Sequence, residues 1–295
     1  MLILEFLKSV LYGIVEGITE WLPISSTGHL ILLNEWLPFR FTDDAVMAAE
    51  FWEMFEVVIQ LGAILAVVIL FWGRLWPFGK RKTATEKRQT WSLWLKVVIG
   101  CLPAAIVGVL GDKLIEKLTD KSIDGWLYNA VVVAVALIVY GVAFILIEKL
   151  RRPDSERITS TADMTCKTAL FVGLFQMLSI IPGTSRSGST ILGAMLLGMS
   201  RTAAAEFSFF MAIPVMVGAS GIKLLGFASY LSESGAALPG SAWGILAIGC
   251  AVSFAVSMVV IRFLMDFVKR HSFSAFGYYR IALGALVLLY FGLVR

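Results

Sequence analysis

Long apolar segments constrain this chain more than any other feature of its sequence. A helix needs roughly 20 mainly apolar residues to cross the hydrocarbon core of a bilayer. Five runs meet this requirement and a sixth, at the end, is shorter: 51–73, 91–111, 126–147, 204–227, 241–261 and 277–294. Because 58% of the residues are apolar and only 16% are charged, the sequence predicts an all-α integral membrane protein with about six spanning helices.

Several other protein classes are excluded by the same composition. A disordered chain would hold far fewer large apolar residues, and three cysteines, an odd number, cannot form the framework of a disulfide-rich secreted domain. The net charge of +4 comes from basic residues in short loops between apolar runs, so we expect no nucleic-acid partner. The first apolar stretch has no basic segment before it, so we expect no cleavable signal peptide.

The loops between the apolar runs differ in positive charge. Lys and Arg number six in residues 74–88, five in 149–167 and three in 262–270, which predicts that these loops face the cytoplasm. Residues 229–240 contain none, and residues 112–124 balance three lysines with four acids, so both loops should face outward.

Two further apolar regions, 2–38 and 168–199, are each interrupted by a polar stretch that contains Gly and Pro. The interruptions are Pro23–His29 and Pro182–Ser189. Each region could form two full spans or one re-entrant helix-loop-helix hairpin, and both interpretations return the chain to the side from which it came. The flanking pieces are short for a full crossing, which favours re-entrant hairpins.

The two interrupted regions resemble one another. An offset of 160 residues pairs Gly13 with Gly173, Ser25 with Ser185, Gly28 with Gly188, Ile31 with Ile191 and Leu32 with Leu192. A second offset, of 149, pairs Trp94 with Trp243 and Ile99–Cys101 with Ile248–Cys250. We therefore predict a duplication, with halves at 1–150 and 166–295 and a cytoplasmic linker at 151–165. Each half has one hairpin and three spans, an odd number, so the second half should be inverted and the hairpins should meet near the membrane midplane.

Ionisable and hydroxyl side chains gather at both interruptions. Glu16 and Glu20 are four residues apart, which places both carboxylates on one face of a helix. The polar residues that follow are Ser25, Ser26, Thr27 and His29 in the first interruption, and Ser185, Arg186, Ser187 and Ser189 in the second. Since ionisable groups within a membrane cost about 2.5–3.5 kcal/mol each, several together predict a functional site.

These residue types suit phosphate chemistry. Arg186 can bind phosphate through two N–H groups, and a half-helix that begins after a Ser/Gly break directs backbone N–H groups at an anion. Glu16 and Glu20 could hold a divalent cation, which we favour, or one could be protonated and act as an acid or base. His29 suits proton transfer. Ser26 could be the nucleophile, although the neighbouring hydroxyls could equally donate hydrogen bonds to phosphate. One turn beyond Glu56, Gln60 could line the cavity.

Each feature also has a purely structural interpretation. Ser, Thr and Gly often satisfy backbone groups inside membranes or let helices pack closely, the acid pair could lie in an aqueous vestibule, and Arg186 could be its counter-ion. We favour the functional interpretation because the residues together supply every part of a phosphoryl-transfer site. The cations near span ends are expected to extend to the membrane interface, namely Lys96, Arg201, Lys223 and Arg280.

Two segments resemble the signature motifs of the bacterial undecaprenyl-diphosphatase family, which is associated with bacitracin resistance. They are Gly13–Leu30, with the sequence GIVEGITEWLPISSTGHL, and Pro182–Gly188, with the sequence PGTSRSG. Phe55–Gly62 and Tyr279–Arg280 extend the resemblance over essentially the whole chain. The resemblance implies a plasma-membrane enzyme, with inverted repeats and two re-entrant hairpins, that removes the terminal phosphate of undecaprenyl diphosphate and recycles the lipid carrier for peptidoglycan synthesis.

The resemblance also assigns roles by motif position. It implies that the active-site residues are Glu16, Glu20, Ser26, His29 and Arg186, with Ser25, Thr27, Ser185 and Ser187 as phosphate-binding neighbours. It further implies a divalent cation (Mg²⁺ or Ca²⁺), a polyprenyl diphosphate lipid substrate, contact with membrane lipids, and a site that faces the outer, periplasmic side. An alternative function is transport of a lipid phosphate or another anion, because inverted repeats with broken helices also build transporters. The sequence leaves open whether the protein forms a homodimer.

Overall fold

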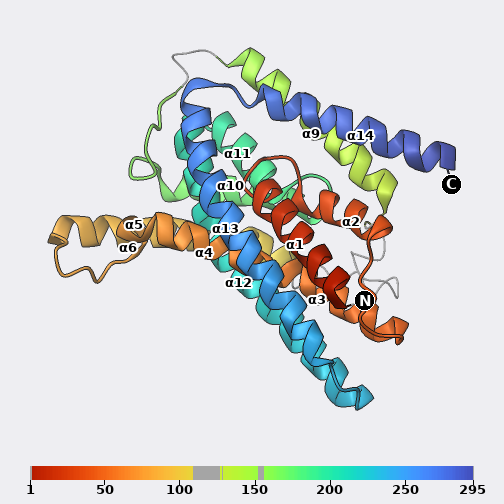
Figure 1. Ribbon diagram of the computed structural model, residues 1–295. Helices are drawn as coiled ribbons and strands as arrows, with labels where there is room; N and C mark the ends of the chain where they lie inside the picture. The colour runs from red at the N-terminus through yellow and green to blue at the C-terminus, as the bar shows by residue number, and fades with distance from the viewer. Residues whose placement is uncertain (1, 109–126, 128, 152–155, 295) are drawn as a thin grey trace. The chain divides into compact units, whose positions relative to one another are not determined.

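A computed structural model describes residues 2–108, 127, 129–151 and 156–294 of the chain (Figure 1). Within these ranges the secondary structure is helical and no strand is present. Six helical segments are long and apolar enough to cross a membrane: Ala45–Leu70, Ala84–Ile106, Ala130–Leu150, Arg201–Ser234, Gly240–Arg270 and Ser274–Gly292. The prediction of an all-α, multi-pass membrane protein with six spanning helices is confirmed. The acidic loop 112–124 lies outside the described residues.

The helices begin and end where local chemistry favours it. The helices of the spans are α3 (Ala45–Val58) with α4 (Gln60–Leu70), α6 (Ala84–Ile106), α9 (Ala130–Leu150), α12 (Arg201–Ser234), α13 (Gly240–Arg270) and α14 (Ser274–Val294). Shorter elements are α1 (Leu2–Thr19), α2 (Ser26–Trp36), α5 (Trp72–Leu75), α10 (Cys166–Met177), η3 (Leu178–Ile180) and α11 (Arg186–Leu196). Side-chain caps open several of them: Asp44 precedes α3, Asn129 precedes α9, and Thr83 forms a capping box with Glu86 at α6.

The chain divides into two compact units, which are described separately. The first unit comprises Met1–Trp21, Ser26–Phe71 and Ala212–Phe263, and the second comprises Leu22–Ser25, Trp72–Met211 and Leu264–Arg295. The short segment Leu22–Ser25, between α1 and α2, thus belongs to the second unit. Each unit takes residues from both predicted halves, and the division at 1–150 and 166–295 stays a prediction.

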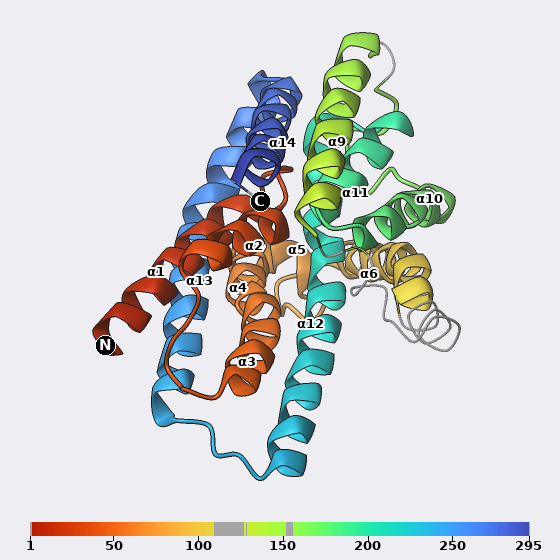
Figure 2. The same ribbon diagram turned by 90° about the vertical axis from the view of Figure 1, so that its right-hand side faces the viewer.

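The first unit is held by an aromatic core and by close helix contacts. Tyr12 of α1 packs against Phe39 and Phe55, with ring centroids 5.1 and 5.8 Å away. The Ser9 hydroxyl donates a 2.5 Å hydrogen bond to the carbonyl oxygen of Ile245 in α13. These contacts hold α1 in place and so orient the residues at the C-terminal end of α1. α2 lies beside α1 (Figure 2).

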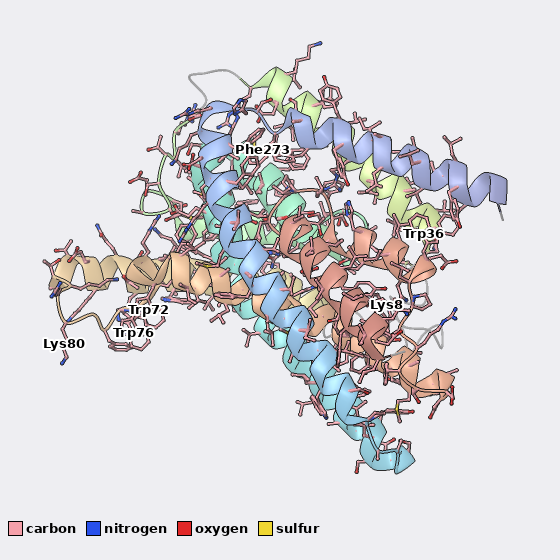
Figure 3. All side chains as sticks on the ribbon, in the orientation of Figure 1. Lys8, Trp36, Trp72, Trp76, Lys80 and Phe273 are labelled. Atoms are coloured by element: carbon pink, nitrogen blue, oxygen red, sulfur yellow. The ribbon has the colours of Figure 1, made fainter. Side chains whose placement is uncertain are left out.

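The second unit is built on two helix pairs. One pair is α9 with α14, which run side by side (Figure 1). The other is α6 with α10, where a Cβ atom added to Gly173 would lie only 2.2 Å from the carbonyl oxygen of Gly100. At one end, Glu148 of α9 accepts hydrogen bonds from Arg201 at 2.8 and 2.6 Å and from the backbone N–H of Phe273, labelled in Figure 3.

Two stacked indoles mark the predicted cytoplasmic interface of the second unit. Trp72 and Trp76 lie 4.9 Å apart and are exposed, as is Lys80 beyond them (Figure 3). Aromatic rings beside basic residues are typical of a membrane interface. Lys96 does not follow its predicted course toward that interface. Lys96 is buried, and its ammonium donates hydrogen bonds to the carbonyl oxygens of Thr161 and Ala162, 3.3 and 3.0 Å away. These hydrogen bonds offset the cost of burying the ammonium group.

Candidate functional site

The acid pair lies at the C-terminal end of α1. Glu16 is fully buried and Glu20 is 4% exposed. α1 ends at Thr19, yet the backbone N–H of Glu20 still donates to the carbonyl oxygen of Glu16 at 3.0 Å. This bond continues the helical path by one residue, so both carboxylates stay on one face, as the spacing predicts.

Ser26 and His29 lie on α2, which begins within the first interruption, directly after Ser25. The Ser26 hydroxyl donates a hydrogen bond to Oε2 of Glu20 at 2.5 Å. His29 is half-buried and lies three residues further along α2, on the side of the helix that Ser26 occupies. The hydroxyl and the carboxylate are therefore in contact, and the imidazole is one helical turn away.

The second interruption presents a guanidinium and several hydroxyls at the start of α11. Ser185 caps the helix, because its Oγ accepts from the backbone N–H of Gly188 at 3.1 Å, and it lies 3.1 Å from the hydroxyl of Ser187. Arg186 is the first residue of α11, and its Nη1 donates to the carbonyl oxygen of Ser208 at 2.7 Å. The start of a helix attracts anions, and Arg186 adds a full positive charge there.

Both interruptions contain a serine in an unusual backbone conformation. Ser25 has φ = 76° and Ser185 has φ = 70°, and no other non-glycine residue among those described has a positive φ. This conformation costs a non-glycine residue about 1–3 kcal/mol, and residues that adopt it are found preferentially at functional sites. Ser25 and Ser185 are also partners at the offset of 160. A serine with a positive φ therefore directly precedes the helix that begins within each interruption.

The structure brings the predicted residues together in two groups. Glu16, Glu20, Ser26, Thr27 and His29 belong to the first unit; Ser25, Ser185, Arg186 and Ser187 belong to the second. The approach of His29 to Arg186 stays a prediction. Gln60 begins α4, in the first unit, and its Nε2 donates to the carbonyl oxygen of Glu56 at 3.5 Å. Its place in the site also stays a prediction.

Arg280 is a residue whose environment the sequence reasoning missed. Its expected extension to the membrane interface is wrong, because the side chain is fully buried. Nη1 donates to the carbonyl oxygen of Pro23 at 2.9 Å, and Nη2 donates to those of Gly183 and Thr184 at 2.6 and 2.9 Å. The available signal was its position within the final apolar run, three residues from the start of 277–294, where an ionisable group is costly.

The acid pair fits a divalent cation. Two buried carboxylates and the hydroxyl of Ser26 offer oxygen donors, which Mg²⁺ and Ca²⁺ prefer. No group of three or more His, Cys, Asp and Glu side chains converges among the described residues. Mg²⁺ bound to phosphate substrates commonly uses only one or two carboxylates, with phosphate oxygens and water as the remaining ligands. The side chains present therefore fit such an ion.

Comparisons with known proteins agree with these motifs. Residues 9–286 match the family described as bacitracin resistance protein BacA. The chain is 52% identical to an undecaprenyl-diphosphatase of Streptococcus thermophilus over 288 residues, which cover 98% of this chain and 94% of the relative. It is 51% identical to the same-named protein of Streptococcus mutans over 295 residues, covering 100% and 99%. An Acetivibrio thermocellus relative with that name is 50% identical over 292 residues, covering 99% and 100%.

Proposed function

Because the chain belongs to the bacitracin resistance protein BacA family, we propose that it hydrolyses undecaprenyl diphosphate to undecaprenyl phosphate and inorganic phosphate. The observation that carries this proposal is the end-to-end similarity, at about 50% identity, to proteins named undecaprenyl-diphosphatase. Both interruptions lie inside the matched region. The alternative of transport finds no support in these relatives, whose names describe a hydrolase.

Substrate binding is the proposed task of the second interruption. Arg186 and the first turn of α11 would bind the diphosphate, since a guanidinium can form two parallel hydrogen bonds to phosphate oxygens. The hydroxyls of Ser185 and Ser187 are next to Arg186, and those of Ser25 and Thr27 would bind from the first interruption. The prenyl tail would stay in the bilayer, its preferred solvent.

Proton and phosphoryl transfer are the proposed tasks of the first interruption. The attacking oxygen is that of Ser26 or of a water molecule, and it forms a bond to the terminal phosphorus. The bond from that phosphorus to the bridging oxygen breaks, and undecaprenyl phosphate leaves with the bridging oxygen. If Ser26 attacks, Glu20 is placed to receive its proton, and water then cleaves the phosphoserine to release inorganic phosphate. His29 would exchange protons with the attacking or leaving oxygen.

Glu16 and Glu20 would hold the divalent cation, Mg²⁺ or Ca²⁺. Such an ion supplies positive charge that neutralises the phosphate oxygens during transfer. The two carboxylates supply the negative charge that holds it. Because Glu20 also accepts the Ser26 hydrogen bond, its two oxygens can serve the ion and the hydroxyl separately.

We place the enzyme in the bacterial plasma membrane, with the site facing the periplasmic side. The support is the distribution of Lys and Arg, which assigns the first hairpin to the outer side. In this position it would recycle the lipid carrier for peptidoglycan synthesis and contribute to bacitracin resistance. A homodimer is compatible with this role, and the mass of the detergent-solubilised protein would reveal it.

The proposed function is tested with detergent-purified protein and undecaprenyl diphosphate. Release of inorganic phosphate with conversion to the monophosphate lipid is the expected result. A protein that releases no phosphate, but moves a labelled lipid phosphate between the leaflets of sealed vesicles, would contradict the proposal. A Ser26→Ala variant further identifies the attacking oxygen: loss of all measurable turnover assigns Ser26, whereas substantial residual turnover assigns water.

A further inference from the structure

Arg280 is a fully buried arginine within a membrane-spanning helix. It lies in the span Ser274–Gly292, and among the described residues no carboxylate forms an ion pair with it. A charged residue at membrane depth costs about 2.5–3.5 kcal/mol on insertion scales and is usually kept for a function. The groups that accept hydrogen bonds from Arg280 therefore indicate its role.

Those partners are backbone carbonyl groups at both interruptions. Nη1 reaches Pro23, in the segment Leu22–Ser25, and Nη2 reaches Gly183 and Thr184. All of these residues belong to the second unit. The first carbonyl lies two residues before Ser25, and the other two lie directly before Ser185. One guanidinium thus contacts the segments that lead into both strained serines.

The surroundings of Arg280 are shaped to hold its side chain. A Cβ atom added to Gly188 would lie 3.0 Å from Nη1, so the absence of a side chain there makes room for the guanidinium. The ring centroid of Tyr140 lies 5.4 Å from Cζ, a cation–π distance, and the Tyr140 hydroxyl is 3.3 Å from that of Ser189. α9, α11 and α14 therefore all contribute to this setting.

Arginine suits this task better than lysine does. The carbonyls of Pro23, Gly183 and Thr184 lie outside helices, and a bilayer offers no water to satisfy such groups. A planar guanidinium with five N–H donors in fixed directions can satisfy three acceptors from two segments at once, whereas an ammonium is a flexible point donor.

We propose that Arg280 is a positioning residue that ties the two interruptions together and so sets the start of α11, with Arg186, relative to Ser25. This proposal deepens the proposed diphosphatase function and rests on it. Arg280 touches neither the substrate nor the reacting atoms in this role. Its contribution is orientation, and misplacement of catalytic groups by about 1 Å can cost on the order of 100-fold in rate.

The test compares Arg280→Gln and Arg280→Lys with Lys96→Gln. Lys96 is a matched control, because it is also a buried cation of the second unit that donates to two backbone carbonyls, but at Thr161 and Ala162, outside the interruptions. Backbone hydrogen exchange and phosphate release from undecaprenyl diphosphate are measured on each purified protein. Arg280→Gln should accelerate exchange in both interruptions together, although they are far apart in sequence, and Lys96→Gln should do so only around residue 161.

The kinetic expectation is equally specific. Arg280→Gln should lower kcat by about 10- to 100-fold with a smaller change in KM, Arg280→Lys should recover part of the loss, and Lys96→Gln should stay within about threefold of wild type. Wild-type exchange in either interruption of Arg280→Gln, or a wild-type kcat, would overturn the proposal. The exchange measurement does not need turnover. A wild-type protein without phosphate release would therefore refute the diphosphatase function and leave the link between the interruptions separately testable.

Discussion

The contact between Ser26 and Glu20 gives the first interruption its chemical character. A buried hydroxyl that donates to a buried carboxylate is arranged as a nucleophile with an adjacent base. At the offset of 160, Arg186 corresponds to Ser26 of the first interruption. The two similar turns therefore carry different functional groups, a hydroxyl in the first and a guanidinium in the second. In the proposed mechanism the first turn would supply the group that attacks phosphorus, and the second would bind the diphosphate.

Removal of the charge at Arg186 should nearly abolish turnover. We expect Arg186→Ala to lower phosphate release by at least about 100-fold, because a preorganised donor to developing phosphate charge is lost. Steady-state assays on purified protein, with thermal unfolding as the check on folding, measure this effect. Arg262→Ala, an exposed arginine, should be unaffected. Near-normal turnover of a folded Arg186→Ala protein would contradict the assignment.

Cation dependence should follow the acid pair. A chelator should eliminate phosphate release, and added Mg²⁺ or Ca²⁺ should restore it, since the ion neutralises charge on the phosphates. Glu16→Gln should raise the cation concentration that gives half-maximal rate, and Glu20→Ala should nearly abolish the rate. Glu53→Gln serves as control, because Glu53 is exposed and pairs with Lys223. Full activity in the chelator would exclude the proposed cation role.

Backbone strain at Ser185 should produce a measurable difference in unfolding temperature between two variants of this residue. At φ = 70° a glycine is unstrained, so Ser185→Gly relieves strain while losing the cap on α11. Ser185→Ala keeps the strain and also loses the cap, which is worth about 1 kcal/mol. Thermal unfolding in detergent should therefore rank Ser185→Gly above Ser185→Ala. The reverse order would show that this turn is not strained.

At the scale of the elements, close helix contacts and caps decide where the interruptions point. α10 precedes the second interruption and is pressed against α6, with Gly173 on the carbonyl oxygen of Gly100. α1 precedes the first interruption and is held by Ser9 and Tyr12. These contacts hold the helices that lead into the two interruptions.

The α6–α10 contact predicts a large effect of one methyl group. Gly173→Ala would place a Cβ atom 2.2 Å from a backbone oxygen, so the helices must separate, and overpacking of this kind typically costs about 1–3 kcal/mol. We expect a lower unfolding temperature and lower turnover. Gly221→Ala is the matched control, because its Cβ atom would meet nothing within 4 Å. Equal unfolding temperatures for the two variants would argue against this packing.

At the scale of the whole molecule, the six spans and the loop charges predict one orientation in the membrane. Because loops rich in Lys and Arg tend to stay in the cytoplasm, we expect residues 74–88 to lie inside and residues 229–240 outside. That orientation carries the proposal that the site faces the periplasm.

Labelling with a membrane-impermeant thiol reagent tests this orientation. In a background with Cys166 replaced by serine, we expect Ala237→Cys to react once the reagent reaches the periplasm, and Lys80→Cys to react only after the plasma membrane is opened. Both positions are exposed, so burial does not explain a difference between them. The opposite pattern would invert the topology and move the site to the cytoplasmic side.

The sequence alone determined the spans, the interruptions and most candidate site residues. Span length and side-chain polarity are local properties, and the bilayer requires them of each helix separately. The spacing of Glu16 and Glu20 is also a local property, because residues four apart lie on the same face of a helix.

Only the tertiary structure decided the backbone conformations and the hydrogen-bond partners of four residues: Ser25, Ser26, Ser185 and Arg280. A positive φ at a serine leaves no pattern in hydropathy, and the hydrogen bond from Ser26 to Glu20 depends on how the chain turns between α1 and α2. Arg280 and Pro23 are 257 residues apart in sequence. No periodicity reports a contact over that separation, so a buried arginine that holds backbone carbonyls looked like one that extends to the membrane surface.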